Sequence, residues 1–173
     1  RMALKQMPFE ESIRVPFIVE YPPAVPKGRR SDALLAPVDI MPTLLSLAGL
    51  NCPEVDGQDI SAAAKGLSSD QRDAVLLMKL LPGGGPYLYN AITPWRGVRT
   101  KRYTYANLLG YGPWLLYDNK KDPYQMNNLI DDPKYAELKT TLEKRMRQLM
   151  NQAHDPGDTQ KIIDFRNSRK PSS

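Results

Sequence analysis

The sequence has little of the chemistry that usually marks a catalytic or metal site. It contains one cysteine, Cys52, and one histidine, His154, among 173 residues. A single cysteine excludes an internal disulfide framework, and a single Cys–His pair excludes a zinc site built from clustered Cys and His ligands. Metal chemistry would therefore need carboxylates, or residues that this sequence does not contain.

Long apolar runs are also missing. The longest, at residues 15–19 and 74–77, fall far below the roughly 20 apolar residues that a membrane-spanning helix needs. The chain opens at Arg1 without an initiator methionine or an apolar leader, so we expect a processed, truncated or separately expressed piece, and its start does not indicate a compartment. The net charge of +5 comes from dispersed bases, so we expect no nucleic-acid partner.

The first half of the chain has the pattern of an incomplete α/β layer. Residues 15–21 form a short apolar run rich in β-branched and aromatic side chains, typical of a strand buried on both faces. Asp39 then precedes apolar positions at helical spacing that end at Gly49, which predicts an amphipathic helix with Asp39 as its N-cap. The apolar positions of that helix are Met41, Leu44, Leu45 and Ala48. One strand and one helix cannot close a sheet, so we expect residues 1–70 to complete a larger domain.

The second half has a different pattern, in which apolar and aromatic segments alternate with Gly and Pro. This predicts a small antiparallel sheet. The predicted strands cover residues 74–80, 97–106 and 114–118. Residues 133–153 carry their apolar side chains on one stripe, which predicts a long helix packed on that sheet.

The candidate nucleophile, base and metal ligands all have ordinary structural explanations. Cys52 has no histidine nearby in the sequence, which favours a bystander thiol, and His154 has the position of a cation at a helix C-terminus. Glu10 and Glu11 point in different directions on a helical turn, so we expect them to face solvent. We assemble no catalytic constellation from these residues.

The pair Asp131 and Asp132 stands directly before Pro133, at the start of the predicted long helix. Carboxylates in this position accept hydrogen bonds from the first backbone N–H groups of a helix. We therefore expect them to cap the helix and not to bind a metal.

A glycine-rich stretch at residues 81–86 lacks the Gly-Lys-Ser/Thr ending of a phosphate-binding loop, and predicts a flexible loop. Aromatic and amide side chains beside a rigid sheet are a common place for ligand contacts, although an ordinary surface loop with a partly buried tryptophan remains an open alternative. The candidate substrate-binding residues are Tyr89, Asn90, Trp95 and Arg96.

Residues 5–19 resemble a segment of the sulfatase family in which a lysine precedes a short helix that ends in Arg-Val-Pro and a buried strand. Here the lysine is Lys5, and Arg-Val-Pro stands at residues 14–16. Further segments resemble the family in the family's own order. They cover residues 38–49, 57–61, 95–103 and 116–129.

The resemblance implies an α/β fold. Residues 1–70 would be the C-terminal part of an alkaline-phosphatase-like sulfatase domain, and residues 71–173 a small α+β subdomain with four antiparallel strands and the packed helix at 133–153. It implies a parent protein that hydrolyses aryl or carbohydrate sulfate esters with a formylglycine nucleophile and a calcium ion, in the periplasm or outside the cell.

The motif Cys/Ser-x-Pro/Ala-x-Arg, from which sulfatases make the formylglycine, is absent here, and Cys52-Pro53 does not match it. We therefore expect the nucleophile and the metal ligands in a missing N-terminal part of the same protein, and no activity from this chain alone. Two alternatives remain open. One is a phosphate or phosphonate ester hydrolase of the same superfamily, and the other is a non-catalytic module that binds an anionic glycan.

Lys5 is the one residue to which the resemblance assigns a part in the chemistry, because the family points a lysine at this position towards the sulfate. An ammonium group is a compact charge with three donors, suited to oxygens that gain charge in the transition state. Arg14 also matches the family pattern, and we assign it no catalytic role.

Overall fold

The computed structural model describes residues 6–67, 72–80, 93–158 and 160–161. By compactness the chain divides into two units, one formed by Arg1–Arg14 with Leu76–Ser173 and the other by Val15–Val75. The helices are α1 (Glu10–Ile13), α2 (Ile40–Leu47), α3 (Ser61–Lys65) and α4 (Ala136–Gln152), with 3-10 turns η1 (Pro37–Asp39) and η2 (Pro133–Tyr135). The strands are β1 (Ala74–Lys79), β2 (Trp95–Thr100), β3 (Tyr103–Leu108) and β4 (Gly112–Asp118).

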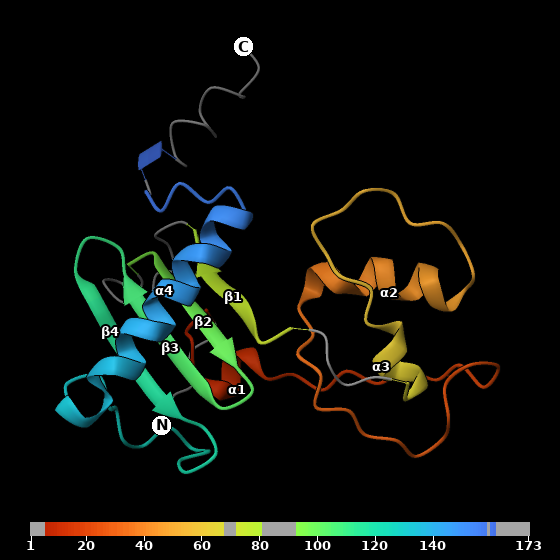
Figure 1. The fold of residues 1–173 in the computed structure, drawn as a ribbon, viewed down its shortest axis with the longest axis horizontal. Helices are drawn as coiled ribbons and strands as arrows, with labels where there is room; N and C mark the ends of the chain where they lie inside the picture. The colour runs from red at the N-terminus through yellow and green to blue at the C-terminus, as the bar shows by residue number, and fades with distance from the viewer. Residues whose placement is uncertain (1–5, 68–71, 81–92, 159, 162–173) are drawn as a thin grey trace, which may run out of the picture. The chain divides into compact units, whose positions relative to one another are not determined.

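The unit that contains both chain ends is built on a four-stranded sheet with the strands in chain order (Figure 1). β2 pairs antiparallel with β3, and β3 pairs antiparallel with β4. The long helix α4 packs on this sheet. The turn η2 leads into it, and there the side chain of Asp132 accepts a hydrogen bond from the N–H of Lys134. The predicted α/β class, with an antiparallel sheet and a packed C-terminal helix, is confirmed. The predicted cap of the long helix was wrong, because the N-cap of α4 is Tyr135, without a side-chain hydrogen bond, and Asp132 caps the preceding turn η2.

The prediction of one strand over residues 97–106 was wrong, because the chain turns back within it. Lys101 and Arg102 form the turn between β2 and β3. The hydroxyl of Thr100 accepts hydrogen bonds from the N–H groups of Arg102 at 3.3 Å and Tyr103 at 2.8 Å. A side-chain hydroxyl therefore closes a turn for which the sequence has neither glycine nor proline.

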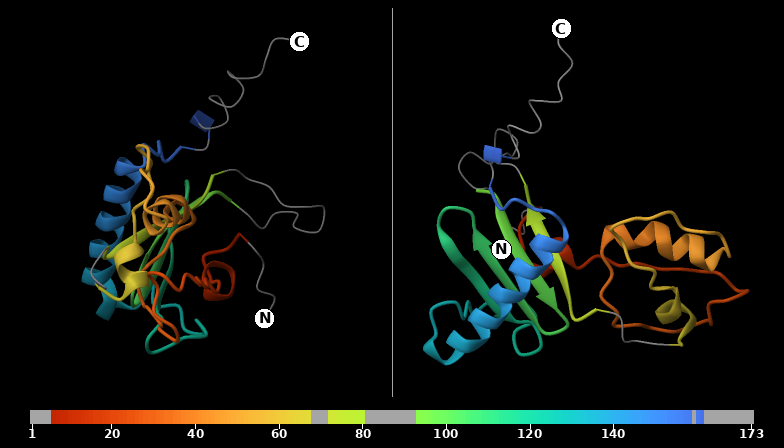
Figure 2. Two further views of the ribbon diagram at one scale, coloured as in Figure 1. Left: turned by 90° about the vertical axis from the view of Figure 1, so that its right-hand side faces the viewer. Right: turned by 45° about the horizontal axis from the view of Figure 1, so that its top comes forward.

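The sheet is covered on both faces, as Figure 2 shows with α4 on one side and α1 on the other. Val98, Tyr105 and Leu116 lie opposite one another across three strands and are fully buried, in register for one face. The other face carries a buried cluster against which Met7 and Phe9 pack. The cluster consists of Trp95, Ala106, Leu115 and Tyr117. Residues from the start of the chain thus complete the core of a sheet formed near its end.

In the unit Val15–Val75, the fully buried side chain of Asp39 joins three segments. Its carboxylate accepts hydrogen bonds from the N–H of Ala36 at 2.6 Å and the N–H of Gln58 at 2.8 Å, and it pairs with Arg72. Gly57 allows the close approach, because a Cβ there would collide with the carbonyl of Val38. The prediction of Asp39 as side-chain N-cap of α2 was wrong, since these partners use its oxygens instead.

The buried face of α2 also differs from the predicted stripe. Met41 and Leu44 are 47% and 48% exposed, whereas Thr43 and Leu47 are buried. The hydroxyl of Thr43 accepts a hydrogen bond from the N–H of Ile60 at 3.0 Å, so a polar side chain holds an inward position. Apolar spacing alone could not identify that position.

Residues 15–21 do not form the predicted strand and have no regular secondary structure. Val15 is 66% exposed and Ile18 is 89% exposed. A strand exists only through its ladder partners, and the described part of the chain provides none for this segment.

Candidate functional site

Of the predicted site residues, Lys5, Tyr89 and Asn90 lie outside the described residues. Trp95 and Arg96 begin β2, and both side chains are buried, with Trp95 only 3% exposed and Arg96 fully covered. The contacts that the structure shows for these two residues are with the protein itself. Their contact with a substrate stays a prediction.

Trp95 holds the residue next to Lys5. Its indole Nε1–H donates a hydrogen bond of 2.9 Å to the backbone carbonyl of Gln6. Gln6 has a φ of +77°, a left-handed conformation that residues other than glycine rarely adopt. The chain is therefore held in an unusual conformation directly after Lys5.

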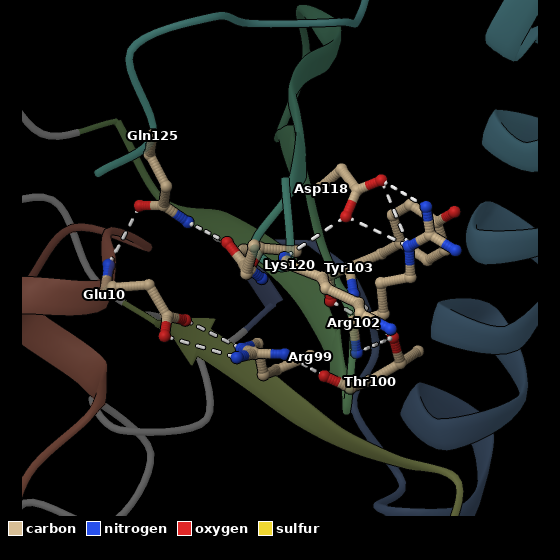
Figure 3. A network of polar contacts seen from close by, with 10 residues as sticks. Glu10, Arg99, Thr100, Arg102, Tyr103, Asp118, Lys120 and Gln125 are labelled. Atoms are coloured by element: carbon tan, nitrogen blue, oxygen red, sulfur yellow. Dashed lines mark hydrogen bonds and ion pairs between the residues drawn. The ribbon is translucent and has the colours of Figure 1, made fainter. Parts of the chain in front are cut away.

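Glu10 is the second point at which this segment is fixed to the sheet (Figure 3). Its carboxylate accepts hydrogen bonds from Arg99 Nε at 2.7 Å and Nη2 at 3.2 Å, a bidentate pair, and its backbone N–H donates to Gln125 Oε1 at 2.9 Å. Glu10 is 8% exposed, so the expectation that it faces solvent was wrong. Its partners lie 89 and 115 positions away, and no local pattern signals them.

Phe9 lies between Gln6 and Glu10 in the sequence and adds an apolar contact with the sheet. Its ring centroid lies 6.5 Å from that of Trp114 and 6.3 Å from that of Tyr117, in edge and tilted geometries. Aromatic pairs in this range stabilise beyond the apolar area that they bury. We call the contacts of Gln6, Phe9 and Glu10 with the sheet the anchoring contacts.

Arg96 of β2 contacts both β1 and the segment that follows α4, so it joins the two strands on either side of the glycine-rich stretch. Its Nη1 donates to the carbonyl of Lys79 at 2.8 Å, and its Nε and Nη2 donate to the carboxylate of Asp155. Burial of Asp155 opposes ionisation, but hydrogen bonds from Arg96 and from the N–H of Gly157 outweigh it and hold the pKa of Asp155 below its usual range. The pair is ionised and buried.

A second ion pair fixes the end of β4. Arg102 donates from Nε and Nη2 to both oxygens of Asp118, the shortest at 2.7 Å, and Asp118 also accepts from the N–H groups of Lys120 and Lys121 (Figure 3). The hydrogen bonds from Arg102 lead the causes that lower the pKa of Asp118. The carboxylate is thus stabilised in its charged form.

This lowered pKa predicts how stability depends on pH. Because the folded pKa of Asp118 lies below the unfolded value of about 3.9, its contribution is fully present above that value and is lost as pH falls through the folded pKa. Asp118→Asn should therefore lower the melting temperature at pH 7 more than at pH 3. The matched control is Asp131→Asn, at an exposed carboxylate, which should change little at either pH. Equal losses at both pH values would contradict the assignment.

Cys52 and His154 lie in separate parts of the chain. Cys52 is exposed with a free thiol, and His154 follows α4 with a φ of +50°. Among the described residues, no group of three or more His, Cys, Asp or Glu side chains is arranged to hold a metal ion. These residues therefore do not fit the calcium ion that the family resemblance implies. In the same part of the chain, no helix is both long and apolar enough to cross a membrane.

The sheet, its packed helix and the anchored segment match known proteins over most of the chain. A curated relative from Formosa agariphila, "Ulvan-active sulfatase", is 36% identical over 155 residues, which cover 87% of this chain and 29% of the relative. A second, "Endo-4-O-sulfatase" from Bacteroides thetaiotaomicron, is 32% identical over 94% of this chain and 34% of its own length. The chain spans about a third of the length of these relatives.

Solved structures share this fold. One, described as a complex with its substrate D-glucosamine-2-N,6-O-disulfate, superposes with a TM-score of 0.77 at 27% identity and covers 88% of this chain and 31% of that chain. A phosphonate monoester hydrolase of Agrobacterium radiobacter superposes with a TM-score of 0.53 at 27% identity over 66% of this chain and 24% of its own. The scaffold is thus shared by a protein whose substrate is a disulfated glucosamine and by a phosphonate monoester hydrolase.

The fold and these matches define a C-terminal sulfatase portion of the alkaline-phosphatase-like superfamily. The chain belongs to the family described as N-sulphoglucosamine sulphohydrolase, C-terminal, whose sequence profile matches residues 2–152.

Proposed function

We propose that the protein that carries this chain hydrolyses sulfate esters of carbohydrates. The observation that carries the proposal is the family match over residues 2–152, together with relatives named as sulfatases of ulvan and of a 4-O-sulfate. A structural relative with a disulfated glucosamine as its substrate supports the same chemical class. Export to the periplasm or out of the cell belongs to the same proposal, as the family resemblance implies.

Lys5 is proposed to bind the sulfate group that is transferred. A fixed ammonium lowers the barrier because the sulfuryl oxygens carry more negative charge in the transition state than in the ground state. The anchoring contacts support this role, since they hold residues 6–10 on a rigid sheet directly after Lys5. A formylglycine and a calcium ion would supply the nucleophile and charge neutralisation, and both are proposed for a region outside this chain.

A hydrolase of phosphate or phosphonate esters is the second candidate. The superposition with a phosphonate monoester hydrolase favours it, at a TM-score of 0.53. The first candidate is better supported, because the matching curated relatives named above are sulfatases. The structure whose substrate is a disulfated glucosamine also superposes more closely, at 0.77.

The proposal is tested with the full-length protein and a panel of sulfated mono- and oligosaccharides that differ in the position of the sulfate. We expect release of inorganic sulfate from at least one carbohydrate sulfate, loss of that activity in EGTA, and recovery with added calcium. Tight binding to sulfated glycans without any release of sulfate would instead favour the non-catalytic module.

A further inference from the structure

The loop at residues 118–127, which begins at the last residue of β4, is held in place from inside. Gln125 is 3% exposed, and its side chain donates a hydrogen bond of 2.8 Å to Oδ1 of Asn119 and accepts one of 2.9 Å from the N–H of Glu10 (Figure 3). Gln125 also has a φ of +50°, which a residue other than glycine keeps only where its surroundings hold it. The loop therefore has a fixed shape.

The two carboxylates of this loop accept hydrogen bonds from its own backbone. Asp118 is 1% exposed and accepts from the N–H groups of Lys120 at 3.2 Å and Lys121 at 3.3 Å. Asp122 accepts from the N–H of Asn127 at 2.7 Å. The acidic side chains thus hold the loop together, whereas both lysines are exposed.

The turn between β2 and β3 lies beside this loop. The N–H of Asn119 donates a hydrogen bond of 2.8 Å to the carbonyl of Arg102. Lys101 and Arg102 are exposed in the turn, as Lys120 and Lys121 are in the loop. The fold brings together two pairs of bases that are far apart in the sequence. We call these four basic residues the basic surface.

The same loop exposes an aromatic ring. Tyr124 is 73% exposed, although burial of an aromatic ring is favourable. Its ring offers an apolar face on which the C–H groups of a sugar ring can pack. Ammonium and guanidinium groups donate charge-assisted hydrogen bonds to the oxygens of sulfate groups. Bases and an exposed ring on one rigid support fit a ligand that has both sugar rings and negative charges.

We propose that the basic surface, together with Tyr124, binds a sulfated polysaccharide chain. This inference rests on the proposed function, hydrolysis of carbohydrate sulfate esters, and names a surface that holds the polymer on which those esters occur. A second contact with the same chain raises the effective concentration of its sulfate groups. The surface therefore lowers KM for the polymer and leaves turnover of a small aryl sulfate unchanged.

The test measures the affinity of the full-length protein for dextran sulfate by calorimetry, at about 0.1 M salt, where exposed charges still interact. The variant combines Lys101→Gln, Lys120→Gln and Lys121→Gln. It keeps Arg102, because Arg102 is the partner of the buried Asp118. We expect a loss of affinity of about tenfold, since each exposed ion pair contributes a factor of up to about five.

The matched control combines Lys27→Gln, Arg30→Gln and Lys144→Gln, which remove the same charge from exposed positions outside the basic surface. Its affinity should fall less than about twofold, because charges farther apart than a Debye length are screened. Equal losses in the two triple variants, at unchanged melting temperatures, would overturn the proposal, since net charge alone would then explain the binding. No loss in the variant of the basic surface would overturn it too.

Tyr124→Ser separates a sugar chain from other polyanions. We expect it to weaken binding of dextran sulfate about threefold and to leave binding of inorganic polyphosphate, which has no sugar rings, unchanged. Equal effects on both, or tighter binding of duplex DNA than of dextran sulfate by the wild type, would overturn the assignment to a sulfated polysaccharide.

Turnover of a small aryl sulfate keeps this inference apart from the proposed function. The variant of the basic surface should hydrolyse the aryl sulfate at the wild-type rate, and a parallel loss of that activity would overturn the binding role. If the wild type released no sulfate from any ester, the proposed function would fail. A loss of dextran sulfate affinity confined to the basic surface would still support binding of the polymer.

Discussion

Lys5→Ala is expected to lower kcat about a hundredfold to a thousandfold in the full-length protein, with the fold intact. Removal of a preorganised charge that faces a developing oxyanion costs roughly 2.7 to 4 kcal/mol in comparable sites. The measurement is turnover of a generic aryl sulfate by the wild type and the variant, with thermal melts of both.

The matched control is Lys144→Ala, which removes an exposed lysine from α4 and should leave kcat unchanged. If Lys5 were only a solvent-exposed residue before α1, its removal would change stability by at most about 0.5 kcal/mol and activity hardly at all. Near-normal turnover of Lys5→Ala would therefore refute the sulfate-binding role.

Asp155→Asn is expected to lower the free energy of unfolding by about 3 to 5 kcal/mol, because it leaves the charge of Arg96 buried without its partner. The side chains of Arg96 and Asp155 are 0% and 3% exposed. Loss of the pair also frees the segment after α4 from β2, the strand that follows the glycine-rich stretch. Urea unfolding, followed by circular dichroism, gives the difference.

The control for this prediction is Glu143→Gln, which breaks the exposed pair of Glu143 with Arg147 on the same helix. Those side chains are 29% and 66% exposed, and pairs of this kind contribute about 0.3 to 0.5 kcal/mol. If both variants lost the same small amount of stability, the buried pair would not hold the helix end to the sheet.

Local patterns in the sequence predicted a large part of the fold. The helical stripe at residues 133–153 located α4, because apolar spacing acts over a few residues. Glycine and proline marked the strand region. The turn at Lys101 and Arg102 was not predicted, because the hydroxyl of Thr100 closes it without either residue. Local signals thus fail where a side chain substitutes for the usual turn residue.

The anchoring contacts could not be predicted from local patterns. Trp95 and Gln6 are separated by 89 positions, as are Arg99 and Glu10, so nothing near either residue marks the pairing. The strand predicted at residues 15–21 was wrong for the opposite reason. Its local pattern is that of a strand, but strand formation depends on partners that the described residues do not supply.

For the candidate site too, some features follow from the sequence and others only from the structure. Lys5 was assigned from a resemblance of the whole segment, since a lone lysine carries no local signature of sulfate binding. The place of Trp95 beside a glycine-rich stretch makes it a candidate, and the structure adds its hydrogen bond to Gln6, which no sequence spacing indicates. Tyr89 and Asn90 remain predictions, because they lie outside the described residues.

We propose that the protein that carries this chain is a sulfatase in which Lys5 binds the transferred sulfate. The most direct measurement compares kcat/KM of the full-length protein for an aryl sulfate and for the matched aryl phosphonate monoester. We predict that the sulfate ester is the better substrate and that Lys5→Ala removes most of this activity. A clear preference for the phosphonate ester, or full activity on the sulfate without Lys5, would contradict the account.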